Sequence, residues 1–477
     1  MERSRVIFGN VISDADYQKA VHGKEKYRKE LGDDSGTDYY FTTRPNEVLA
    51  DIGVQELVLS EAPGTALPEN AVIVGNIRMG YGHYRISAAI ASAAHALGYT
   101  PCWLDLNAFP ESTATKLISK QNDLYSLGSR LSQQSKLFNT AVWEPLNSEG
   151  FRKLTYNASD QKASELMEPL LRHLPKDVPY LATHAWPAQA AIHAGFRRVV
   201  NVIPDNWPMA LHLAEGSIHT VQTPSAFLGY KMLRGMDKKR ILKPMPEGSV
   251  VYTGHYVDDE LVKNIGTDCE KRLERMRTGQ PRRYLLSVGG AGAQQKLFED
   301  IIRHLLPQAE AGKAALLINV GDHQDVWESL VKQIPALGDE AQTHFNDYAA
   351  AKAFIEADEF PGVQVFGDDG IFAAVYLTNL LLRGCDVLLT KPGELAYYPV
   401  PKLMLHRVGG HEAWGAIRTA ELGDGTYECE RTGEVLAMLD EITFGGEILP
   451  MLCQGVLRAN AAGIYNGAYE AVKLAVK

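Results

Sequence analysis

A glycine turn between an apolar run and a helical pattern carries the first residues in this chain that could do chemistry. The run 71–74 is typical of a buried parallel strand, and the turn after it contains Gly80, Gly82 and His83. Apolar residues then recur at helical spacing. Backbone N–H groups and the positive end of the helix dipole meet at such a turn, which therefore predicts a site for an anion. His83 is a candidate general base, because the pKa of an unperturbed imidazole, about 6.5, is close to working pH.

A second set of candidates lies in the C-terminal half of the chain. The glycine turn with Gly289, Gly290 and Gly292 follows an apolar segment and predicts a phosphate cradle built from backbone N–H groups. Two further apolar runs lead into the remaining candidates, which are Lys391, Gly393, Glu394, His411 and Glu412. A lysine in this setting would stabilise the negative charge that develops on a departing diphosphate.

Asp205 is a second candidate base. It follows the apolar run 198–203 within the segment Pro204–Pro208, where the alternative interpretation is a turn residue. The acid pairs Asp258-Asp259 and Asp368-Asp369 are interpreted as turn acids, so no metal site is predicted. His184 and His255 follow two apparent strands, and we expect local hydrogen bonding for both.

Strand-like and helix-like segments alternate from residue 71 onward, which indicates the α/β class. Two strand–glycine–helix openings, about 210 residues apart, predict two Rossmann-like domains that face each other across a cleft. The expected parts are an N-terminal extension (1–70), an N-terminal domain (71–257), a linker (258–281), a C-terminal domain (282–451) and a C-terminal helix (452–477) that packs back on the N-terminal domain. For the extension, a lid, an edge addition and a partner surface all remain open.

Charge and composition restrict the partners. The net charge of −10 argues against broad attraction to nucleic acid or anionic lipid, although a local basic patch stays open. No run of about 18 apolar residues occurs, and the N-terminal segment has no signal-peptide core. The five cysteines are scattered without a CxxC pair. We therefore expect a cytoplasmic, reduced protein.

Three of these motifs, in their order, resemble the type B (GT-B) glycosyltransferases. They are Gly82-His83, Lys391-Pro392-Gly393 and Gly410-His411-Glu412, and the resemblance covers roughly residues 70–450. It is closest to the family of monogalactosyldiacylglycerol synthase and the N-acetylglucosaminyltransferase that completes lipid II. His411 and Gly415 stand where that family has Gln and Asn, and the helix expected after Gly393 is truncated.

The resemblance implies an inverting, metal-independent glycosyltransferase without a cofactor. The C-terminal domain would bind a nucleotide diphosphate sugar, expected to be a UDP-sugar, and the N-terminal domain a lipid-linked or small-molecule acceptor. Glu394 could replace the missing ribose contact, and His83 or Asp205 would be the base. Peripheral contact with the inner face of a membrane and a soluble acceptor are both open, as is the oligomeric state; no nucleic acid partner is expected. The alternatives are a nucleotide-sugar epimerase of the same fold and an inactive sugar-nucleotide-binding protein.

Overall fold

The computed structural model describes residues 2–134, 150–288 and 294–477, with only the backbone described for 124–134 and His411. The chain divides into two compact units. The first contains Met1–Met79, Ile86–Asp258 and Asn466–Lys477, and the second contains Gly80–Arg85 and Asp259–Tyr465. Each unit has its own sheet, and each is described by itself.

The sheet of the first unit has the order β10-β9-β8-β7-β5-β6-β4-β3. Every neighbouring pair is parallel except β3 with β4. The strands are β3 (Phe41–Pro45), β4 (Gln55–Leu59), β5 (Ala71–Asn76), β6 (Thr100–Asp105), β7 (Tyr180–Ala182), β8 (Val199–Val202), β9 (Ile218–Val221) and β10 (Val250–Tyr252). A separate hairpin pairs β1 (Val6–Ile7) with β2 (Asn10–Val11).

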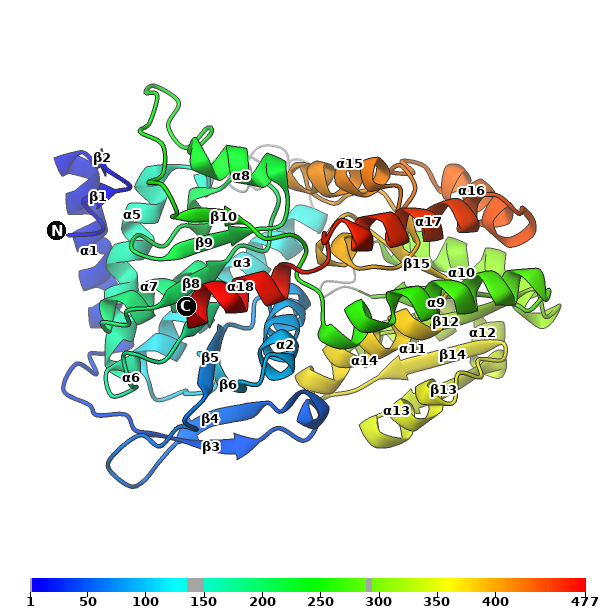
Figure 1. The fold of residues 1–477 in the computed structure, drawn as a ribbon, viewed down its shortest axis with the longest axis horizontal. Helices are drawn as coiled ribbons and strands as arrows, with labels where there is room; N and C mark the ends of the chain where they lie inside the picture. The colour runs from blue at the N-terminus through cyan, green and yellow to red at the C-terminus, as the bar shows by residue number, and fades with distance from the viewer. Residues whose placement is uncertain (1, 135–149, 289–293) are drawn as a thin grey trace. The chain divides into compact units, whose positions relative to one another are not determined.

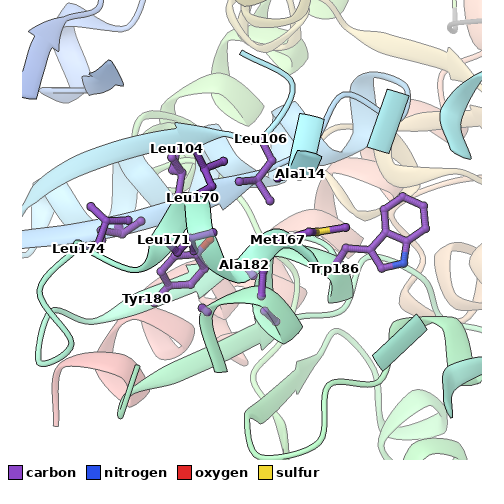
Figure 2. Close-up of a cluster of buried hydrophobic side chains, with 14 of the residues drawn as sticks. Leu104, Leu106, Ala114, Met167, Leu170, Leu171, Leu174, Tyr180, Ala182 and Trp186 are labelled. Atoms are coloured by element: carbon purple, nitrogen blue, oxygen red, sulfur yellow. The ribbon is translucent and has the colours of Figure 1, made fainter. Parts of the chain in front are cut away.

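Helices cover this sheet because its central strands are apolar on both faces. All six residues of β5 are buried, as a parallel strand between two helical layers requires. The helices are α1 (Asp14–Leu31), α2 (Tyr81–Ala96), α3 (Thr113–Gln134), α5 (Leu154–Ala163), α6 (Glu168–Leu171), α7 (Ala185–His193) and α8 (Pro224–Lys231). Short 3-10 turns are η1 (Ala50–Ile52), η4 (Ser164–Met167) and η5 (Ala210–His212). Figure 2 shows part of the core, where Leu170 and Leu171 group with Tyr180, and Met167 lies next to Trp186.

The predicted N-terminal extension contributes to this sheet. Its strands β3 and β4 extend the sheet beyond β6, which is the edge addition among the three open roles. Helix α1 begins where the Ser13 side chain accepts a hydrogen bond from the Asp16 N–H, and acidic residues occupy its first turn.

The sheet of the second unit has the order β13-β14-β12-β11-β15-β16, with every pair parallel. Its strands are β11 (Arg282–Ser287), β12 (Ala314–Asn319), β13 (Ala341–Phe345), β14 (Val363–Gly367), β15 (Val387–Thr390) and β16 (Lys402–Met404). The helices are α9 (Asp259–Arg277), α10 (Gln295–Glu310), α11 (Gln324–Gln333), α12 (Pro335–Glu340), α13 (Tyr348–Glu356), α14 (Ile371–Gly384), α15 (Ala413–Leu422), α16 (Thr432–Phe444) and α17 (Ile448–Ala461). Two 3-10 turns, η6 (Glu394–Tyr397) and η7 (Gly410–Glu412), flank β16 in sequence.

The C-terminal segment forms two helices instead of the single predicted one. After α17 the chain turns at Gly463, whose φ of +73° favours glycine, and α18 (Gly467–Val476) follows. Helix α18 lies against β7 and β8 of the first unit (Figure 1). The prediction of two Rossmann-like α/β domains is confirmed, because each unit holds a helix-covered sheet dominated by parallel strands. The predicted cleft stays a prediction.

Within the described ranges, no helix combines the length and the apolar character that crossing a bilayer requires.

Candidate functional site

The carboxyl end of the second sheet contains a point where the strand order reverses. From β11 the chain continues to the neighbouring strand β12, forms the edge strand β13, and inserts β14 between β12 and β13; it then crosses to the opposite side of β11 as β15. Ligands of open parallel sheets bind outside the strand ends at such a reversal. The turn after β11, with Gly289, Gly290 and Gly292, lies outside the described residues. The turn after β15 is described and contains Lys391, Gly393 and Glu394.

Lys391 forms an ion pair with Glu412 across this edge. The other carboxylate oxygen of Glu412 accepts hydrogen bonds from the backbone N–H groups of Val408, at 2.8 Å, and Gly409, at 3.2 Å. The Glu412 side chain is buried, whereas 36% of the Lys391 side chain is exposed. A buried carboxylate therefore holds the ammonium of a side chain that is partly exposed.

Gly393 leaves space beside this pair. A Cβ at Gly393 would lie 3.6 Å from Lys391 Nζ and 3.9 Å from Glu412 Oε1. A side chain at this position would extend from the backbone next to the ammonium. Glycine therefore lets a ligand approach the backbone and the cation together.

Glu394 begins the 3-10 turn that replaces a longer helix, as the sequence predicted. Its Oε1 accepts a hydrogen bond from Arg85 Nη1 at 2.5 Å, and Arg85 Nη2 donates to Thr378 Oγ1 at 3.2 Å. Arg85 is almost fully buried. A Cβ at Gly82 would lie 3.5 Å from the Glu394 carboxyl, so the glycine turn packs directly on this acid.

A second contact holds the first turn of α2 within the same unit. The Tyr81 hydroxyl donates a hydrogen bond to Asp322 Oδ1 and accepts one from the Asp322 N–H at 2.9 Å. Burial, and then the contact with Asp322, raises the pKa of Tyr81. Gly321 must be glycine here, because it has a φ of +63° and a Cβ would come within 2.4 Å of the Tyr81 hydroxyl.

These contacts explain why Gly80–Arg85 belong with the second unit, although the predicted N-terminal domain included them. His83 lies in this turn and is partly buried. The second unit therefore contains both the first glycine turn and the described donor candidates. The turn contributes Gly80, Gly82 and His83, and the donor candidates are Lys391, Gly393, Glu394 and Glu412. The backbone of His411 lies in η7, and its side chain is outside the described part of the chain.

Asp205 lies in the first unit, after β8, and forms a different network. Its Oδ2 is 3.2 Å from His212 Nε2, and His212 Nδ1 is 2.6 Å from the Tyr230 hydroxyl. The Tyr230 hydroxyl donates to the Trp207 carbonyl at 3.1 Å. Asp205 is partly exposed, whereas His212 and Tyr230 are buried. The buried side chains therefore hold the Asp205 carboxylate in place. His184, expected to bond locally, accepts a hydrogen bond from the Trp186 N–H and caps α7.

Sequence reasoning missed Arg85, Tyr81 and Asp322. The available signal was a long cation placed directly before the apolar stripe of a predicted helix, where burial requires a partner. The partners are 241 and 309 residues away, so the pattern of the local sequence could not identify them. Among the described residues, no group of three or more His, Cys, Asp or Glu side chains could hold a metal ion.

Two family models cover most of the chain. Residues 6–232 match the model described as a domain of unknown function, DUF6937, and residues 245–476 match that of DUF6938. No curated protein matches the chain.

Solved structures of two kinds of sugar-nucleotide protein are similar to this chain. The α,α-trehalose 6-phosphate synthase of Burkholderia multivorans is 12% identical, with 86% of this chain and 98% of that chain covered and a TM-score of 0.44. The UDP-GlcNAc 2-epimerase of Neisseria meningitidis, bound to UDP-GlcNAc, is 13% identical, with 84% and 98% covered and a TM-score of 0.46. Similarities of this size carry no argument about the reaction of this chain.

Proposed function

We propose that this protein is an inverting glycosyltransferase of type B architecture, which moves a sugar from a nucleotide diphosphate, expected to be a UDP-sugar, to an acceptor hydroxyl. The observation that carries this proposal is the position of Lys391. Its ammonium lies at the strand-order reversal, beside Gly393, and is held by the buried Glu412. A fixed, partly exposed cation at this place suits a diphosphate.

Lys391 would act on the leaving group. When the bond between the anomeric carbon and the diphosphate breaks, negative charge grows on the diphosphate oxygens. A cation that is already oriented by Glu412 stabilises that charge with little reorganisation. Backbone N–H groups at Gly289, Gly290 and Gly292 would add to this effect. Glu394 would meet the ribose, with Arg85 orienting its carboxylate.

His83 would be the base. It lies in the unit that holds Lys391 and directly follows Gly82, which packs on Glu394. Its imidazole would take the proton of the acceptor hydroxyl as the oxygen forms the new bond to the anomeric carbon. Asp205, supported by His212, is the second candidate for this role.

The acceptor would bind to the first unit. Near the strand ends of this unit Asp205 is partly exposed, while Thr183 Oγ1 bonds with Ser87 Oγ at 2.9 Å and with Asn76 Oδ1 at 3.2 Å in a fully buried network. A lipid-linked acceptor and a small soluble one fit this proposal equally.

A nucleotide-sugar epimerase is the second candidate, because it needs carboxylates near the reacting sugar. Asp322 and Glu394 both contact the turn that contains His83, through Tyr81 and Arg85 respectively. Epimerisation would appear as conversion of the nucleotide sugar without any acceptor.

The test begins with thermal unfolding in the presence of a nucleoside diphosphate panel. A ligand that binds only the folded protein raises the melting temperature, and we expect UDP to raise it most. The matching nucleotide sugars are then incubated with lipid-linked and soluble acceptors, and release of the diphosphate is measured. Acceptor-dependent release supports the proposal, conversion without acceptor supports the epimerase, and binding without any turnover indicates an inactive binding protein. If no nucleoside diphosphate stabilises the fold, the proposal is wrong.

A further inference from the structure

One segment of the first unit carries a charge opposite to that of the whole chain. Residues 231–243, with the sequence KMLRGMDKKRILK, contain six basic residues and one acid, whereas the chain has a net charge of −10. The segment extends from the end of α8 toward β10, and Figure 1 draws it as the green loop between those two elements. It is the local basic patch that the overall charge left open.

Buried side chains fix this loop to the core. Leu233, Met236, Leu242 and Met245 all belong to one buried cluster with residues of β9 and β10. Backbone contacts add to this anchoring, since Asn10 accepts from the Lys243 N–H at 2.8 Å and donates to the Lys243 carbonyl at 3.0 Å. The basic side chains between these anchors are therefore presented from a fixed backbone.

The same surface exposes large aliphatic side chains. Ile241 is 99% exposed, and Leu228 and Met232, one helical turn apart at the end of α8, are 62% and 53% exposed. Four basic residues that are close to them in the sequence are also exposed: Arg234, Lys238, Lys239 and Arg240. Part of the charge is neutralised, because Arg240 Nε donates to Asp237 Oδ2 at 2.8 Å. The segment 231–243 as a whole still contains more basic than acidic side chains.

We propose that this basic–apolar surface, formed by Leu228, Met232, Arg234 and Lys238–Ile241, docks on an anionic lipid bilayer. Exposed aliphatic tips enter the boundary between headgroups and acyl chains, while long basic side chains reach lipid phosphates. Charge complementarity excludes a second copy of this positive surface. A single-stranded nucleic acid is less well matched, because its bases stack on aromatic side chains and residues 231–243 contain none, and a duplex would leave the exposed aliphatic side chains without an apolar partner. The inference is independent of the proposed transferase activity.

The test is sedimentation of the full chain with vesicles of phosphatidylcholine, with and without about 30% phosphatidylserine. We expect binding to the anionic vesicles only, and weaker binding at about 0.5 M NaCl, where charges are screened. The triple variant Lys238→Gln, Lys239→Gln and Arg240→Gln should lower the partition coefficient about 100-fold. Ile241→Asp should also lower it, because a carboxylate cannot enter the interface.

A matched variant controls for total charge. Lys19, Lys26 and Lys29 are exposed on α1, and changing all three to Gln removes the same charge from another surface. This control should bind like the unchanged chain, and all variants should keep their melting temperature. Binding that is equal for both triple variants, equal for neutral and anionic vesicles, or seen only with a single-stranded oligonucleotide would overturn the proposal.

Discussion

The two units differ in how they treat buried polar groups. The second unit buries ion pairs, such as Arg275 with Asp386 at 2.7 Å and Lys402 with Asp424 at 2.9 Å, and in the latter pair burial lowers the pKa of Lys402 and raises the pKa of Asp424. The first unit buries groups in their neutral forms: burial raises the pKa of Asp160 to about 8 and lowers that of His219 to about 4. The contrast extends to the strand ends: Lys391 and Glu394 of the second unit form ion pairs, whereas Thr183 and Asn76 of the first unit belong to a buried network of neutral groups.

This contrast has a consequence for ligands. An ionised group fixed before the ligand arrives stabilises charge in the ligand, while neutral hydrogen-bonding groups recognise hydroxyls without attracting phosphate. Under the proposed function, the fixed cation Lys391 of the second unit would meet the diphosphate, and the first unit would bind the acceptor. Each of the following variants alters one side of this difference.

His83→Ala should have the largest effect, on turnover. Loss of a general base lowers the rate by about 10²- to 10⁴-fold, while the affinity for the nucleoside diphosphate stays within about twofold of the unchanged chain. Single-turnover kinetics and calorimetry measure the two quantities. His22→Ala, an exposed substitution on α1, is the control. Unchanged turnover would remove His83 from the mechanism and favour Asp205.

Lys402→Met should destabilise the second unit by about 3–5 kcal/mol, because it leaves the charge of Asp424 buried without its cation. Lys402 also donates to the carbonyls of Tyr398 and Val400, which lose that donor. Adding Asp424→Asn should restore much of the loss, since the amide oxygen can still accept from Tyr465. Thermal unfolding measures both variants. If the double variant is no more stable than the single one, the buried charge is not the cause.

Lys391→Ala should weaken nucleoside diphosphate binding by about 1–3 kcal/mol, the range for a lost charge-assisted hydrogen bond. The buried Glu412 then faces the diphosphate without its partner, which adds repulsion. Lys391→Arg should retain more affinity, and Lys332→Ala, on the exposed face of α11, should retain all of it. Calorimetry that gives the same dissociation constant for the Lys391→Ala variant and the unchanged chain would refute the placement of the donor.

Asp160→Asn should change the pH dependence of stability. Trp186 donates a hydrogen bond to this acid, Tyr27 and Tyr156 lie near it, and burial dominates its pKa. The folded chain keeps the proton up to about pH 8, while the unfolded chain loses it near pH 4, so stability falls as pH rises between these values. The slope for one group is at most about 1.4 kcal/mol per pH unit. The Asn variant should lose this slope, and Glu69→Gln, at an exposed acid, should keep it.

Much of the fold was predictable because the central strands of parallel sheets are continuous apolar runs. The apolar runs at 71–74 and 198–203 correspond to β5 and β8. The strands β3, β4 and β13 were missed. They lie at or near sheet edges and are largely exposed or half-buried, so their sequences alternate weakly or not at all.

Two candidate residues from neighbouring motifs, Lys391 and Glu412, lie in contact, while their role in binding a donor stays a prediction. Lys391, Gly393 and Glu412 lie within two short segments, and the structure joins these segments through the ion pair. Arg85 was not predictable as a partner of Glu394, because tertiary packing alone brings these residues together. The helix after Gly393 was predicted to be truncated, and the short 3-10 turn η6 stands in its place, but the acid Glu394 is engaged by an arginine that the motif does not contain.

Helix α18 makes the first unit discontinuous in sequence, since Asn466–Lys477 return to it after the whole of 259–465. Gly467 fits so closely that a Cβ would lie 2.2 Å from the Gly254 carbonyl oxygen. During synthesis from the N-terminus, the side of β7 and β8 that α18 covers therefore remains uncovered until residues 259–465 have been synthesised. A nascent or truncated chain ending before Asn466 would present this apolar side to chaperones and proteases.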